Sequence, residues 1–93
     1  MAILIDAPNW WHRERWWGHL VSDHSYDELH AFAERLGAPR RGFDRDHYDI
    51  PEHLYDTALA AGASLVTSRE LVTRLTAAGL RRPKHLHTPE STT

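Results

Sequence analysis

The chain is expected to fold as a small layered α/β sandwich, Rossmann-like in type, with a short, at least partly parallel sheet and about three helices. Short apolar segments rich in β-forming residues alternate with longer segments whose apolar residues recur every three to four positions. Such alternation is typical of strands joined by helical crossovers. Crossovers of this kind require some neighbouring strands to run parallel.

The first strand and the segment after it are defined by a change from apolar to polar residues. Residues 2–5 are apolar and are closed by Asp6, which predicts a buried strand with Asp6 at its carboxyl end. The Trp-rich residues 8–18 have neither helical nor strand periodicity, so we expect a long loop there. Residues 19–22 are expected to form a second short strand that ends at Asp23.

Two of the expected helices have complete start and stop signals. Residues 25–28 match a capping box, and Gly37 follows the last apolar residue at helical spacing. Residues 63–67 are expected to form a strand. A second capping box at 67–70 then predicts a helix that ends at Gly79.

A further helix is expected between these two. Pro51 is suited to the first turn of a helix, because its missing N–H would have no partner there. Asp49 or Ile50 is then expected to be the N-terminal cap, and Gly62 follows the last helical turn.

Length and composition predict one domain over residues 1–87 and a disordered tail at 88–93. The 93 residues carry a formal charge of -2, so no global cationic field is expected. No segment has the length of a membrane span, and the first residues lack the features of a signal peptide, so we expect a cytoplasmic protein without membrane contact.

Imidazole and carboxylate groups gather at the predicted ends of strands and helices, most densely in residues 44–51. The expected metal ligands are His19, Asp23, His47 and Asp49. Asp6 is expected to be a further ligand or a general base, and Tyr48 a donor to the transition-state oxyanion. The chain has no cysteine, so nitrogen and oxygen would hold the metal, which we expect to be zinc, manganese or magnesium.

These residues also have alternatives that need no metal. Helix capping alone accounts for carboxylates at Asp23 and Asp49, and His19 can hydrogen-bond across the sheet. A different grouping is a purely acidic cluster, which would hold Mg or Mn if the loops that carry these residues come together. Its members are Asp6, Asp46, Asp49 and Glu70.

The tryptophans and arginines predict contacts with partners. The four tryptophans are Trp10, Trp11, Trp16 and Trp17. Their large apolar area favours packing or a homodimer contact, and stacking on nucleic-acid bases beside nearby arginines is the alternative. A modest phosphate-binding patch would be made by Arg40 and Arg41 with the basic residues 81–84. Nucleic-acid binding, a third possibility, would use Arg13, Arg15, Arg40, Arg41, Arg81, Arg82 and Lys84.

The chain resembles a family of small bacterial and phage proteins known as domain of unknown function 4031. The resemblance rests on the strand ending in Asp6 and on residues 17–23, 28–37, 47–49 and 61–63. It extends to about residue 80. It implies that the family pattern includes His19, Asp23, His30, His47, Tyr48 and Asp49, and it implies no particular activity.

A fainter similarity is to PIN-like nucleases, and it rests on residues 61–68. The acidic residue that follows this strand in such nucleases is absent here or displaced to Glu70.

The function predicted from these observations is hydrolysis of a phosphoester or a related small substrate by a metal-binding enzyme. The alternative is a non-enzymatic module that binds protein or nucleic acid through its Trp-rich segment.

Overall fold

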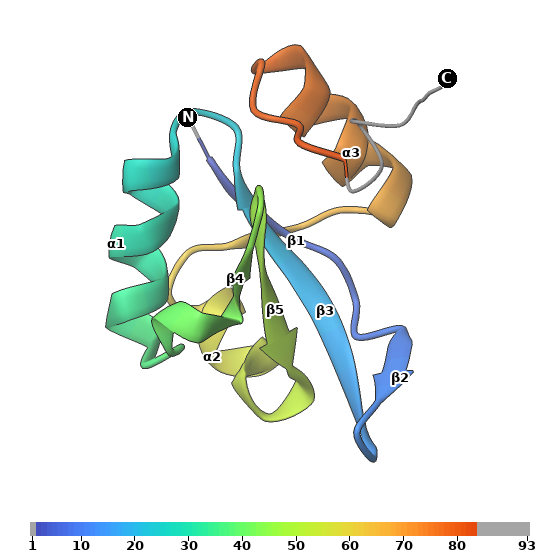
Figure 1. Ribbon diagram of the computed structural model, residues 1–93. Helices are drawn as coiled ribbons and strands as arrows, with labels where there is room; N and C mark the ends of the chain where they lie inside the picture. The colour runs from blue at the N-terminus through green and yellow to red at the C-terminus, as the bar shows by residue number, and fades with distance from the viewer. Residues whose placement is uncertain (1, 84–93) are drawn as a thin grey trace.

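The computed structural model describes residues 2–83 and contains a mixed sheet with helices against both of its faces (Figure 1). Its strands are β1 (Ile3–Ile5), β2 (Trp10–His12), β3 (Arg15–Ser22), β4 (Phe43–Asp44), β5 (His47–Pro51) and β6 (Ser64–Leu65). Its α-helices are α1 (Tyr26–Leu36), α2 (Tyr55–Ala60) and α3 (Ser68–Ala77), and 3₁₀ helices lie at Arg40–Gly42 and Glu52–Leu54. The tail expected at 88–93 falls outside the described residues.

The strand order is β4-β5-β3-β1-β6, and β2 pairs with residues 15–17 at the start of β3. β1 and β6 are parallel, whereas β3 is antiparallel to both β1 and β5. This arrangement confirms the predicted layered α/β class with a partly parallel sheet.

The Trp-rich segment forms a hairpin and not the expected loop. β2 pairs with β3 in the register Trp10↔Trp17 and Trp11↔Trp16. The turn residues Arg13 and Glu14 have φ of 52° and 63°. Two consecutive positive φ angles match the twist of a tight two-residue hairpin turn. The chain reverses direction at this turn, and β3 then pairs antiparallel with both β2 and β1.

Each face of the sheet packs against different helices. Ile5, Leu20 and Ile50 belong to the core cluster that packs under α1 and α2. Leu4 and Val21 belong to a second cluster, with Leu71 and Leu75 of α3. α3 lies on the other side of the sheet from α1 (Figure 1). The strand period of two residues produces this division, because successive side chains point to opposite faces.

Two predicted helix starts are confirmed by their caps. The Ser25 side chain accepts a hydrogen bond from the backbone N–H of Glu28, and that of Thr67 accepts one from Glu70. Gly37 ends α1 with φ of 82°, a left-handed conformation that glycine adopts without steric cost.

The helix expected to begin after Asp49 or Ile50 starts later, because residues 47–51 form β5. Burial alternates along this strand, and Tyr48 and Ile50 are buried in the core. Pairing with β3 supplies hydrogen bonds and core contacts that outweigh the local capping pattern. The 3₁₀ helix then begins at Glu52, and α2 begins at Tyr55.

Among the described residues, no helix combines the length and the apolar character needed to cross a bilayer.

Candidate metal centre

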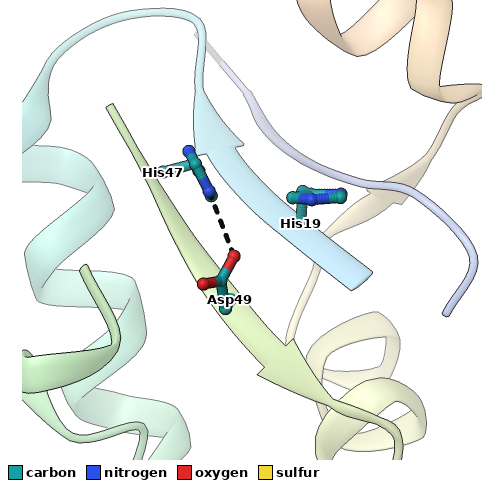
Figure 2. A group of neighbouring side chains, drawn as sticks. All are labelled: His19, His47 and Asp49. Carbon is teal, nitrogen blue, oxygen red and sulfur yellow. Dashed lines mark hydrogen bonds and ion pairs between the residues drawn. The ribbon is translucent and has the colours of Figure 1, made fainter. Parts of the chain in front are cut away.

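Three of the four expected ligands lie together on one face of β3 and β5 (Figure 2). His19 on β3 is the cross-strand partner of Asp49 on β5, and His47 lies two residues before Asp49 on the same face. One nitrogen from each histidine and one carboxylate oxygen lie within 4.8 Å of one another. This group, which we call the His/Asp group, has the ligand types and the spacing of a metal site.

His19 is oriented by the buried carboxylate of Asp6. Nδ1 of His19 lies 3.0 Å from Oδ2 of Asp6, and the backbone N–H of His19 donates to Oδ1 at 2.6 Å. The hydroxyl of Ser68 donates to Oδ2 at 2.6 Å. Because Asp6 engages Nδ1, Nε2 is the nitrogen of His19 that remains for a metal.

His47 lies between two carboxylates. Its Nδ1 is 2.7 Å from Oδ1 of Asp46, and its Nε2 is 3.0 Å from Oδ1 of Asp49 (Figure 2). Asp46 is 1% exposed, and its Oδ2 accepts hydrogen bonds from Nη1 of Arg81 at 3.1 Å and from the backbone N–H of Arg82 at 2.7 Å. The C-terminal arginines thus hold Asp46, which in turn orients His47.

The two orienting carboxylates are ionised at neutral pH. Burial acts to raise the pKa of Asp6, but hydrogen bonds from His19 and Ser68 outweigh burial and bring the pKa below its usual value. The pKa of Asp46 is lowered for the same reasons, with burial opposed by hydrogen bonds from His47 and the C-terminal arginines. Both groups therefore present a negative charge to an imidazole.

The charge on His47 is set by its two carboxylate neighbours. Burial acts to lower the pKa of the imidazole, but hydrogen bonds to Asp49 and Asp46 outweigh it and raise the pKa above 6.5. When His47 is protonated, both of its ring nitrogens carry a proton, and Nε2 donates to Asp49. A divalent cation placed between Nε2 and Asp49 would replace this proton.

Gly18 allows Asp6 to approach β3. A Cβ at Gly18 would lie 2.8 Å from the backbone oxygen of Asp6 and 3.3 Å from its Oδ1. A side chain at this position would push Asp6 away from His19. The close approach of Asp6 to β3 therefore requires glycine at position 18.

The His/Asp group is reached from two hollows. One, of about 250 Å³, is lined by both histidines together with Arg45, Ser68 and Arg81. A larger one, of about 560 Å³, includes Asp49 in its wall and extends under the β2–β3 hairpin. Solvent or a small substrate can therefore approach the three ligand atoms.

Asp23 does not join the expected ligands. Its side chain accepts a 2.6 Å hydrogen bond from the backbone N–H of Ala2 and contacts Arg74 at 2.7 Å. Because β3 runs antiparallel to β1, Asp23 lies beside the start of β1, whereas Asp6 and His19 lie at its end. Asp23 would reach the same edge of the sheet as Asp6 only if these two strands were parallel. Asp6 and Ser68 do meet at one edge.

Tyr48 is also positioned differently from the expected oxyanion donor. It lies between His47 and Asp49 in β5 and therefore points to the opposite face of the sheet. Its hydroxyl lies 2.7 Å from Nδ1 of His30 on α1, within the core. Asp6 differs in a smaller way, since its contacts make it an orienting group for His19.

The purely acidic alternative is not assembled. Glu70 lies in the first turn of α3, where its backbone N–H donates to the Thr67 cap. Its half-exposed carboxylate lies 3.6 Å from Nη1 of Arg74. Asp6 and Asp46 each face a different histidine.

Two orienting residues were not predicted from the sequence: Asp46 as the partner of His47, and Ser68 as a donor to Asp6. The only local signal was the adjacency of Asp46 and His47. Ser68 is distant in sequence, and no local pattern connects it to Asp6.

The fold and the His/Asp group define a small mixed α/β protein with a candidate metal centre on one face of its sheet. The family model that matches is described as protein of unknown function (DUF4031), and it covers residues 3–78. The chain belongs to this family, as its resemblance predicted. Comparisons with curated proteins and with solved structures find no match, and nothing in them supports the fainter similarity to PIN-like nucleases.

Proposed function

We propose that the protein binds a divalent cation through His19, His47 and Asp49 and uses it to hydrolyse a phosphoester or a related small substrate. One observation carries this proposal: Nδ1 of each histidine contacts a buried aspartate, and one nitrogen of each ring lies within 4.8 Å of the other and of a carboxylate oxygen of Asp49. Carboxylates in this position fix the ring orientation and increase the basicity of metal-binding histidines.

The ligand set supports zinc or manganese over magnesium. Two imidazoles and one carboxylate suit transition metals, whereas Mg²⁺ prefers oxygen ligands. Three protein ligands also leave coordination positions for water or substrate, as in catalytic zinc sites.

A cation bound here would lower the pKa of a water molecule and polarise a phosphoryl oxygen. In the reaction, the oxygen of water bonds to phosphorus and the water loses a proton, while the bond from phosphorus to the leaving oxygen breaks and that oxygen takes up a proton. Arg45 and Arg81 line the smaller hollow, where guanidinium groups suit the charge on phosphoryl oxygens. His19, His47 and Asp49 would hold the cation beside them.

Hydrolysis of bis(p-nitrophenyl) phosphate tests this function. Chelator-treated protein is assayed alone and after addition of Zn²⁺, Mn²⁺ or Mg²⁺. We expect activity with zinc or manganese, and we expect Asp49→Asn to abolish it. Asp56→Asn, a matched change at an exposed position on α2, should retain it. Equal rates for wild type and Asp49→Asn, or no rate above buffer with any cation, would refute the proposal.

A second candidate function, a homodimer contact, is supported by the other side of the hairpin. Trp11 and Trp16 are 56% and 43% exposed. Their rings meet edge to face, with ring centres 5.2 Å apart. Their exposed apolar area is suited to a second copy of the chain. Light scattering of the Trp11→Ser, Trp16→Ser variant tests this: a dimer should become a monomer, and a monomeric wild type would exclude the contact.

A further inference from the structure

The larger hollow has a strongly cationic lining. Three arginines line it, Arg13 and Arg15 from the hairpin and Arg41 from the segment after α1. Asp49 is the only carboxylate in its wall. Within residues 2–83, none of these three guanidinium groups forms an ion pair with a carboxylate. This part of the surface therefore attracts an anion, although the whole chain has a net negative charge.

A row of aromatic rings connects the hairpin with the His/Asp group. Trp10, which is 41% exposed, stacks on His12 with ring centres 4.9 Å apart and planes inclined by 9°. On its other side it lies 6.2 Å from His19, with an angle of 12° between the rings. All three side chains come from the same face of the sheet, because Trp10 is the cross-strand partner of Trp17. The row thus ends at a candidate metal ligand.

The hairpin is held in place before any ligand arrives. Glu52, just after β5, accepts a 2.8 Å hydrogen bond from the backbone N–H of Trp16. The indole of Trp17 donates to the backbone oxygen of His12 at 2.8 Å. The guanidinium of Arg15 lies over the ring of Trp17, 5.9 Å from its centre. The cationic and aromatic groups are therefore preorganised, which reduces the entropy lost on binding.

We propose that this hollow binds single-stranded nucleic acid, with phosphates on the arginines and a base against the Trp10–His12 surface. Paired bases hide their flat faces within the duplex, so an aromatic surface favours an unpaired strand. The volume of about 560 Å³ is suited to a small portion of such a strand. Because Asp49 belongs to both the hollow and the His/Asp group, a bound strand has a phosphodiester beside the candidate metal centre.

This inference rests on the proposed function only for the cleavage of the bound strand, because binding itself requires no metal. Fluorescence anisotropy of a labelled short oligothymidylate, in chelator and low salt, measures binding separately. We expect Arg13→Ala with Arg15→Ala, and Trp10→Ala alone, each to weaken binding by about tenfold or more. Arg69→Ala, at an exposed arginine on α3 outside the hollow, should bind as wild type does.

Additional variants separate this proposal from the others. His47→Ala should retain oligothymidylate binding, whereas it should remove metal-dependent hydrolysis. Trp10→Phe should restore most of the affinity that Trp10→Ala loses, and circular dichroism of both variants checks that they fold. Added salt should weaken binding steeply. The inference is overturned if wild type does not bind the oligothymidylate, if the arginine variant binds it equally, or if a duplex binds as tightly as the single strand.

Discussion

Nδ1 of His47 lies 2.7 Å from Oδ1 of Asp46, a carboxyl group that is 1% exposed and is also bound by Arg81 and the backbone of Arg82. Together with the corresponding contact between Asp6 and His19, it gives both histidines a fixed orientation. Carboxylates paired with histidines in this way are typical of metal-binding sites.

Replacing Asp46 with asparagine should weaken metal binding without removing a ligand. Loss of an orienting carboxylate typically reduces metal affinity about 10–100-fold. The unfolding free energy should also fall by about 1–3 kcal/mol, because buried hydrogen-bonding groups lose a charged partner. Calorimetric zinc titration and urea unfolding measure the two effects. Asp44→Asn, at a half-exposed carboxylate nearby, is the control and should change neither.

The metal-free protein should lose stability as pH rises above 6.5. The raised pKa of His47 means that its protonated form is stabilised by folding. This contribution to stability is fully present below pH 6.5 and is lost as the pH increases through the raised pKa of His47. Urea unfolding across this range should show the decline in wild type and a smaller one in His47→Gln. Identical pH dependence in both proteins would show that the pairing with Asp46 and Asp49 adds no stability.

Gly18→Ala should disturb the His/Asp group through the backbone. The added Cβ would lie 2.8 Å from the backbone oxygen of Asp6, so Asp6 or β3 must move. We expect a loss of about 1–3 kcal/mol in unfolding free energy, as for other overpacked positions. Gly42→Ala is a matched control, since its Cβ would meet its nearest atoms at 3.6 Å, an ordinary contact distance. Similar unfolding curves for both variants would argue against this close approach.

Asp23→Ala tests whether Asp23 has a structural role or binds the metal. Asp23 bonds to the backbone of Ala2 and to Arg74, away from the His/Asp group. We therefore expect lower thermal stability and unchanged zinc affinity. A large loss of zinc affinity would restore Asp23 to the ligand set that the sequence predicted. Thermal unfolding and zinc titration on the same preparation provide both readings.

Sequence patterns predicted the features of this fold that depend on neighbouring residues. The caps at Ser25 and Thr67 and the end of α1 at Gly37 are local hydrogen-bonding and steric effects, so a few residues are enough to specify them. The β2–β3 hairpin was missed because all of β2 and the start of β3 are exposed, which leaves no alternation of apolar and polar residues.

The sequence predicted the residue types of the candidate site, but only some of the individual residues that form it. His19, His47 and Asp49 meet because β3 and β5 pair across about thirty residues of sequence, which no local pattern encodes. The direction of β3 carries Asp23 away, and the pleat of β5 turns Tyr48 into the core. Asp46 was visible in the sequence, but its role depends on the position of the C-terminal arginines.

Calorimetric titration of chelator-treated protein with Zn²⁺ tests the His/Asp group most directly. We expect saturable binding of one zinc ion per chain in wild type, and loss of that binding in both His19→Ala and His47→Ala. Circular dichroism establishes that the variants remain folded. Absence of zinc binding by wild type, or unchanged binding by either folded variant, would contradict the assignment of these residues as a metal centre.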